Sequence, residues 1–157
     1  MAELISRDPG FDVNIEQDEH GQTLLYYACF ESWCSPVIPL LLAHPGIDIN
    51  LKNRDGWTPF YSACENGRIS CVRELLKDSR VKVNEPDNIG HTPLRIAAAD
   101  GHFYIIKWWI ACGREMDLGK PGDEKTDAIG RASWQGRTEV VTLLEDSKRT
   151  RRILGMR

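Results

Sequence analysis

The amino-acid sequence predicts an all-α solenoid, in which pairs of short helices stack side by side. Three observations lead to this prediction. The stretch DGWTPFYSACENG at residues 55–67 recurs as IGHTPLRIAAADG at residues 89–101, an apolar stretch of nine residues follows each copy, and a short extended piece comes next. A helix of about two turns is unstable alone in water, so each copy must pack against its neighbours.

Residues 55–67 contain the signals that begin and end one short helix. Gly56 suits a turn that needs positive φ, and Thr58 can cap the helix through its hydroxyl. Pro59 fits the first helical position, where no N–H is needed, and Gly67 supplies a left-handed end. The stretch therefore predicts a helix that begins after Thr58 and ends before Gly67.

The same frame occurs in two further, weaker copies. HGQTLLYYACFES at residues 20–32 lacks the proline and the final glycine, and EKTDAIGRASWQG at residues 124–136 uses Asp127 as its cap. The cap positions are Thr23, Thr58, Thr92 and Asp127, at spacings of 35, 34 and 35 residues. Small side chains that would let neighbouring helices approach closely occur at Ala28, Cys29, Ala63, Cys64, Ala97 and Ala98.

A longer apolar element and an extended piece follow the short helix. Apolar residues at i, i+3 and i+4 predict buried helices in SPVIPLLLA (35–43), ISCVRELLK (69–77), FYIIKWWIA (103–111) and TEVVTLLED (138–146). Alternating residues that run into Asn, Asp, Gly or Pro predict β-hairpin-like fingers at IDINLKN (47–53), VKVNEPD (81–87) and EMDLGKPG (115–122). Each unit is thus a short helix, a turn, a longer helix and a finger.

This pattern resembles the ankyrin repeat family. A period of about 33 residues with T-P-L-H-x-A and two helices describes that repeat, and the chain carries TPFYSA at 58–63 and TPLRIA at 92–97. The resemblance covers nearly all of residues 8–146. Tyr26, Tyr61 and Arg95 stand where the family often has His.

The repeats predict one domain over residues 1–157. Near its start, Asp12, Val13 and Asn14 align with Asp48, Ile49 and Asn50, which indicates the second half of a unit. We expect a half repeat at 1–18, repeats at about 19–53, 54–87, 88–122 and 123–147, and a basic C-terminal tail at 148–157. This leaves the first complete unit thinly covered, so either the chain is cut from a longer array or residues 2–7 cap that unit.

Composition favours a globular domain without a membrane segment. The chain has 157 residues, of which 41% are hydrophobic and 27% charged, as is ordinary for a globular domain. It has no apolar run of about 18 residues and no signal-peptide pattern. We therefore expect a location in the cytoplasm or the nucleus and no contact with a membrane.

The residue types do not indicate catalysis. The five cysteines lack C-x-x-C spacing, and Cys29 and Cys64 occupy equivalent positions that suit small core residues. The four histidines are spread along the chain rather than gathered in one place, and GKPG at 119–122 lacks the phosphate-loop frame. We therefore expect no enzyme activity, no cofactor, no metal and no small-molecule substrate.

The resemblance implies binding of another protein on the concave face, which is the surface formed by the fingers and the short helices. Residues beside each finger turn and at the end of each short helix would face the partner. The implied protein-binding residues are His20, Gln22, Phe30, Glu31, Arg54, Asp55, Trp57, Glu65, Asn66, Asn88, Ile89, His91, Asp100 and Trp134, with Glu19, Ala99 and Gln135 beside them.

Large aromatic residues divide between this surface and the core. Phe30, Trp57 and Trp134 occupy positions that a stacked core does not need, and aromatic anchors suit protein recognition. Trp57 could equally pack across the next finger. Trp108 and Trp109 fall where the other units have Leu75 and Leu76 or Leu143 and Leu144, so both are predicted to fill the core.

Charge is unevenly distributed along the chain and leaves a second function open. Residues 1–50 hold eight acids against Arg7, a net charge of −7, and the end of the chain is basic at Lys148, Arg149, Arg151, Arg152 and Arg157. These cations could complement the dipole of the last helix or contact nucleic acid. We predict a monomeric, non-catalytic protein-interaction module that does not bind nucleic acid. The alternative is a regulatory or targeting segment of a larger protein, whose basic tail contacts nucleic acid or an acidic surface.

Overall fold

A computed structural model of the chain describes residues 10–31 and 35–155. Helices are the regular elements of these residues, and no β-strand occurs among them. Their order is α2 (Leu24–Phe30), η1 (Ser35–Val37), α3 (Ile38–Leu42), α4 (Pro59–Glu65), α5 (Ile69–Lys77), α6 (Pro93–Asp100), α7 (Phe103–Ala111), α8 (Ala128–Trp134) and α9 (Thr138–Ile153).

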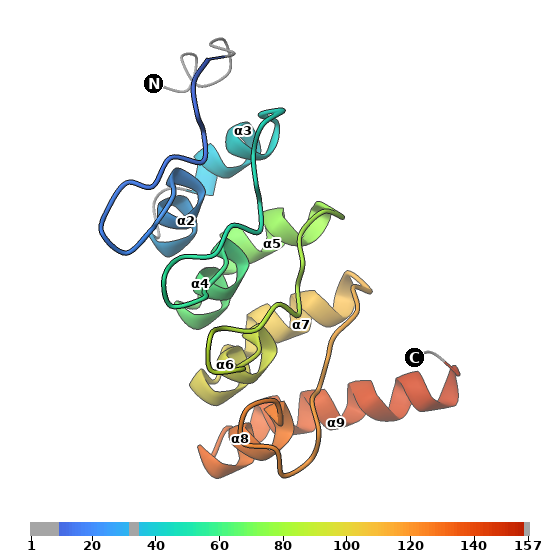
Figure 1. Cartoon of the computed structure of the whole chain (residues 1–157). Coiled ribbons are helices and arrows are strands. Elements are labelled where there is room, and N and C mark those ends of the chain that lie inside the picture. The colour runs from blue at the N-terminus through green and yellow to red at the C-terminus, as the bar shows by residue number, and fades with distance from the viewer. Residues whose placement is uncertain (1–9, 32–34, 156–157) are drawn as a thin grey trace.

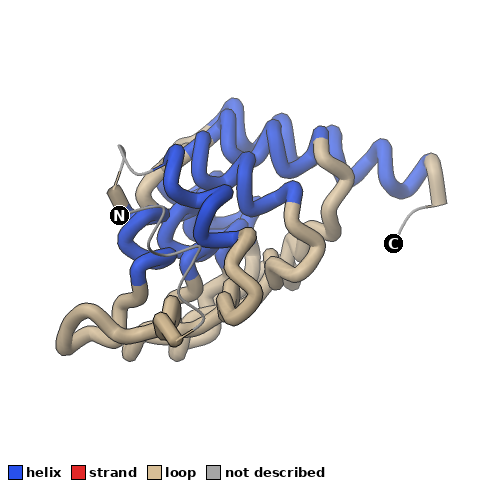
Figure 2. The backbone as a smooth tube through the Cα atoms, turned by 90° about the horizontal axis from the view of Figure 1, so that it is seen from above, coloured by secondary structure: helices blue, strands red, loops and turns tan. Residues whose placement is uncertain are grey.

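The helices form two parallel rows. Figure 1 shows α2, α4, α6 and α8 stacked as an inner row, with α3, α5, α7 and α9 stacked behind them as an outer row. The connecting segments gather along one edge of the stack, as the tan segments in Figure 2 show. This architecture confirms the predicted all-α solenoid with projecting fingers.

The predicted caps hold the inner helices at their first turns. Thr58 Oγ1 accepts a hydrogen bond from the backbone N–H of Tyr61 at 3.1 Å, and Thr92 Oγ1 accepts one from Arg95 at 3.3 Å. Asp127 Oδ1 does the same for Gly130 at 2.7 Å. These bonds satisfy N–H groups that a helix cannot pair internally.

Small residues lie between the stacked inner helices, as predicted. Helix α2 contacts α4, α4 contacts α6, and α6 contacts α8. The side chains at the contacts are buried at Ala28, Cys29, Ala63, Cys64, Ala97, Ala98, Ala128 and Ala132. A single apolar core therefore runs the length of the stack, and no repeat has a core of its own.

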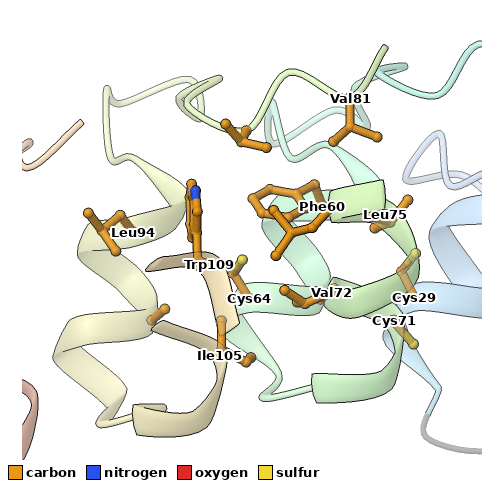
Figure 3. Close-up of a cluster of buried hydrophobic side chains, with 14 of the residues drawn as sticks. Cys29, Phe60, Cys64, Cys71, Val72, Leu75, Val81, Leu94, Ile105 and Trp109 are labelled. Atoms are coloured by element: carbon orange, nitrogen blue, oxygen red, sulfur yellow. The ribbon is translucent and has the colours of Figure 1, made fainter. Parts of the chain in front are cut away.

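Trp109 fills the core between two repeats. Its side chain is fully buried, and its ring meets that of Phe60 edge to face with centroids 5.0 Å apart (Figure 3). Its indole N–H donates to the carbonyl of Glu115 at 3.3 Å. A large aromatic ring with a satisfied polar atom stabilises a core strongly, so the prediction for Trp109 is confirmed.

The same prediction was wrong for Trp108. This side chain is 42% exposed on the outer helix α7, and the Arg73 guanidinium covers part of the ring at 4.1 Å from its centroid. The reason is register. With the 34-residue offset from Thr58 to Thr92, Trp109 occupies the position equivalent to Leu75. Trp108 occupies the position equivalent to Glu74, whose side chain is half-buried.

Long side chains of one repeat hold the end of the preceding inner helix. His102 Nε2 lies 2.8 Å from the carbonyl oxygen of Glu65, the last residue of α4. At the equivalent positions, Arg68 Nε donates to Phe30 O at 2.7 Å and Arg137 Nε donates to Ala99 O at 3.0 Å. His102 therefore has a structural role at the end of the preceding inner helix.

Two outer helices differ from their predicted bounds. The stretch expected as one helix at 35–43 splits into η1 and α3, because Pro39 lacks an N–H and fits the first turn of a new helix. Helix α9 continues to Ile153, so residues 148–153 of the expected tail are part of the last helix. Arg151 lies along that helix with its guanidinium 3.4 Å from the carbonyl oxygens of Arg114 and Met116.

Three of the described cysteines lie in the core. Cys29, Cys64 and Cys71 are buried, whereas Cys112 is exposed. Burial raises the pKa of the Cys29 and Cys64 thiols well above the usual range, so both stay protonated. The core role predicted for Cys29 and Cys64 is confirmed, and Cys34 lies outside the described residues.

Candidate protein-interaction surface

A carboxylate or amide side chain shapes each of three finger turns. Asn53 Oδ1 accepts the N–H groups of Asp55 at 3.0 Å and Trp57 at 2.9 Å. Asp18 and Asp87 do the same in the neighbouring repeats, each five residues before its helix cap. This role was not predicted, although Asp or Asn recurs five residues before the capping Thr in all three repeats.

Backbone hydrogen bonds join neighbouring turns into one row. The N–H of Arg54 donates to His20 O at 2.9 Å, and the N–H of Asn88 donates to Asp55 O at 3.1 Å. The Asn88 side chain also donates to Arg54 O at 2.7 Å. The structure thus brings four of the predicted residues together, one turn above the next, on the surface formed by the fingers.

Asparagines tie the arms of successive fingers together. Asn50 Oδ1 accepts the N–H of Lys82 at 2.8 Å, and its amide donates to Arg80 O at 3.0 Å. Asn14 makes the same pair of bonds to Asp48 N at 2.7 Å and to Gly46 O at 2.8 Å. The described part of the predicted N-terminal half unit therefore docks on the stack as a finger.

Four acidic residues meet between the second and third complete repeats. Glu65 is the last residue of α4 and is half-buried, and Asp100 is the last residue of α6 and is exposed. Burial, as the largest cause, and the negative charges of Asp100, Asp87 and Asp55 together raise the pKa of Glu65 from 4.5 to about 7. We call Asp55, Glu65, Asp87 and Asp100 the acidic cluster.

Trp57 stands beside this cluster with a fixed ring. Its side chain is half-buried and stacks on Tyr61, with ring centroids 5.4 Å apart and an interplanar angle of 22°. The Tyr61 hydroxyl donates to Asp87 Oδ2 at 3.1 Å, and His91 Nδ1 lies 3.5 Å from the same oxygen. The rings and the carboxylate therefore hold one another in place around the turn.

The remaining predicted residues lie on both sides of the cluster. Asn66 donates its side-chain amide to Ser62 O at 2.9 Å, which fixes it at the end of α4. Phe30 and Trp134 end the first and last inner helices and are exposed, as is Ile89 on a finger turn. Gln22 and Glu31 are half-buried. Ala99 is buried and so does not offer the surface that was expected of it.

Comparison with known proteins identifies the family. A sequence profile described as "Ankyrin repeats (3 copies)" matches residues 1–87 and again residues 34–120. The chain belongs to the ankyrin repeat family. The two-row helical stack and the recurring helix caps agree with this assignment.

Three relatives show the range of proteins that contain similar repeats. The human SMC5-SMC6 complex localization factor protein 1 is 42% identical over 81% of this chain, which corresponds to 12% of that protein. The human transient receptor potential cation channel subfamily A member 1 is 30% identical over 85% of this chain and 12% of its own length. The putative ankyrin repeat protein YahD of Escherichia coli is 33% identical over 55% of this chain. The chain thus spans only a small part of the two human relatives.

The described residues contain neither a membrane-spanning helix nor a metal-binding group of side chains. Among residues 10–31 and 35–155, no helix is both long and apolar enough to cross a membrane. Within the same residues, no group of three His, Cys, Asp or Glu side chains is placed to hold a metal ion.

Proposed function

We propose that this chain is a non-catalytic interaction module that binds a partner protein on its concave face. The contact centres on the acidic cluster and Trp57. The partner contributes a lysine or arginine side chain, which lies against Glu65 and Asp100. The whole array acts as a rigid support that brings residues of separate repeats to one surface.

The observation that carries this proposal is the half-buried Glu65 carboxyl among three further acids. A carboxylate in such a place is disfavoured by burial and by like charge, which is why its pKa is raised to about 7. A cation placed there reverses both effects, because it supplies the missing counter-charge. Binding of a basic side chain therefore relieves an unfavourable arrangement that the free chain holds.

Trp57 supports the same partner chemistry. A lysine or arginine can lay its alkyl stem along an aromatic ring while its charged end reaches a carboxylate. Stacking on Tyr61 holds the Trp57 ring in place before binding, so little side-chain entropy is lost. Buried aromatic and charged anchors with a polar surround are typical of protein interfaces.

The comparisons support an adaptor role without fixing the partner. One relative is named as a localization factor of a protein complex, which suits a module that binds and positions other proteins. We propose the cytoplasm or the nucleus as the location, and a monomer as the free state. The alternative, in which the basic tail contacts nucleic acid or an acidic surface, is less well supported. Arg151 of that tail instead contacts backbone carbonyls of the preceding repeat.

Selection from a random short-peptide library displayed on phage tests the proposed partner chemistry. Peptides selected by the wild-type chain should be enriched in Lys and Arg, and the enrichment should disappear when Glu65→Gln and Asp100→Asn are combined. Glu139→Gln, an exposed acid on α9, is the matched control and should select the same peptides as wild type. Selection of acidic or purely apolar peptides by the wild-type chain would contradict the proposal.

A further inference from the structure

A pocket lies at the C-terminal end of the concave face. Its volume is about 460 Å³, and it is bounded by Arg95 of α6, by Arg131 and Trp134 of α8, and by the finger residues 122–124. Of these residues, only Trp134 was predicted to face a partner protein. The pocket is distinct from the acidic cluster, since none of the four acids of that cluster lines it.

Two guanidinium groups form the inner wall of this pocket. Arg95 is 6% exposed, and its Nε donates to the carbonyl of Glu124 at 2.6 Å. Arg131 places its guanidinium 4.5 Å from the centroid of the Trp134 ring. Its Nε is buried and has no hydrogen-bond partner among the residues that the structure describes. A buried donor without a partner carries a free-energy cost that a ligand atom could remove.

Two carboxylates around the pocket, Asp123 and Asp127, accept hydrogen bonds within the finger turn, while the negative charges of Asp87 and Glu124 act on Arg95 without forming an ion pair. Asp127 accepts the N–H groups of Gly130 and Gly122, each at 2.7 Å. Asp123 accepts the N–H of Lys125 at 2.9 Å and the hydroxyl of Thr126 at 3.0 Å. In the described part of the chain, neither Arg95 nor Arg131 forms an ion pair with a carboxylate.

Unpaired guanidinium groups in a partly buried place leave a local excess of positive charge. Buried charges in proteins are normally paired, because desolvation of a lone charge is costly. The effect reaches a neighbouring side chain: burial lowers the pKa of His91, and the positive charges of Arg95, Arg131 and Lys125 lower it too. The end of the concave face at α8 therefore differs in sign from the acidic cluster.

We propose that this pocket binds an oxyanion carried by the partner segment, either a side-chain carboxylate or a phosphate monoester. Arg131 would donate its free Nε–H and Arg95 its terminal amino groups, in the forked geometry that suits both oxyanions. The Trp134 ring lies against the Arg131 guanidinium and helps to hold it at the wall of the pocket. The proposal rests on the proposed function only for the statement that a partner protein supplies the anion. The partner segment then carries a basic residue for the acidic cluster and an acidic or phosphorylated residue for this pocket.

Titration of the isotope-labelled chain with inorganic phosphate, and separately with sodium acetate, tests the pocket without a partner. Nuclear magnetic resonance should show saturable shifts of the Arg131 Nε–H and the Trp134 indole N–H, with sodium chloride at equal ionic strength as the reference. Saturation by phosphate alone indicates a phosphorylated partner residue. Saturation by acetate, alone or as well, indicates that a carboxylate suffices.

Three variants test whether Arg95 and Arg131 bind the oxyanion. Arg131→Gln and Arg95→Gln should each weaken phosphate or acetate binding roughly tenfold or more. Arg149→Gln, an exposed arginine of α9, removes the same charge and should leave binding unchanged. Urea unfolding of each variant shows that it is folded. Equal shifts in Arg131→Gln and wild type, or shifts that never saturate, would overturn the proposal.

Glu65→Gln separates this proposal from the proposed function. It should abolish selection of basic peptides but leave the phosphate and acetate titrations unchanged. If the basic-peptide selection fails in the wild-type chain while the oxyanion still saturates the pocket, only the proposed function is contradicted. If the wild-type chain selects basic peptides but neither phosphate nor acetate saturates the pocket, only the oxyanion proposal is contradicted.

Discussion

The Tyr61 hydroxyl donates a hydrogen bond to Asp87 Oδ2 across 3.1 Å and so joins the inner helix of one repeat to the finger turn of the next. Asp87 uses its other oxygen to hold the N–H groups of Ile89 and His91. One carboxylate thus fixes a turn and links two repeats. The residue that the family often has as His is Tyr61 here, and its longer reach makes this link possible.

Tyr61→Phe should destabilise the chain by about 1 to 2 kcal/mol, because it removes one partner of a buried hydrogen bond to a charged group. Urea unfolding measures the change in free energy. Tyr104→Phe is the matched control, since Tyr104 is exposed on α7, and it should shift the midpoint little. Equal effects of the two variants would show that the link to Asp87 adds no stability.

Trp109→Ala and Trp108→Ala should differ strongly in stability although the two residues are adjacent. Loss of the buried Trp109 ring should cost about 3 to 5 kcal/mol, through lost transfer free energy and an unfilled cavity. Loss of the exposed Trp108 ring should cost less than about 1 kcal/mol, since it gives up mainly its contact with Arg73. Thermal unfolding of both variants is the measurement, and a reversed order would contradict the register of α7.

Ala97→Leu should overpack the contact between inner helices and cost about 1 to 3 kcal/mol. Ala97 is fully buried between neighbouring repeats, where no space for a larger side chain is open. Ala111→Leu at the exposed end of α7 serves as the control. An unchanged urea midpoint in Ala97→Leu would mean that the inner helices are less closely packed than described.

Glu65→Gln should stabilise the free chain at about pH 8 by roughly 1 kcal/mol and have no effect at about pH 4. The pKa of Glu65 is raised from 4.5 to about 7 in the folded chain. The folded chain therefore holds its proton between these values, and wild-type stability falls as pH rises through about 7. Urea unfolding at both pH values measures the difference. A destabilised Gln variant at the higher pH would show that the carboxylate is already neutralised by another group.

Much of the fold could be predicted because its signals are local. Thr58, Pro59 and Gly67 act within a few residues of their own positions, so their spacing predicts a helix start and end without any knowledge of neighbours. The split at Pro39 and the exposure of Trp108 depend on the exact register of the outer helices. A shift of one position in the alignment moves a side chain from core to surface.

The acidic cluster could not be predicted as a unit from the same pattern. Glu65 lies seven residues after its cap and Asp100 lies eight after its own, so the two do not occupy one frame position. They meet only because α4 and α6 stack. Arg95 and Arg131 of the oxyanion pocket likewise come from different helices, α6 and α8. The sequence does not show that the nearby Asp123 and Asp127 accept hydrogen bonds within the finger turn instead of pairing with these arginines.

The affinity of a selected basic peptide for the wild-type chain and for Glu65→Gln tests the central claim most directly. The measurement uses fluorescence polarisation of the labelled peptide, with Glu139→Gln as the control and urea midpoints to show that all three chains are folded. We predict that Glu65→Gln raises the dissociation constant at least about tenfold while Glu139→Gln leaves it unchanged. An unchanged dissociation constant in Glu65→Gln would contradict the claim that the acidic cluster is the binding site.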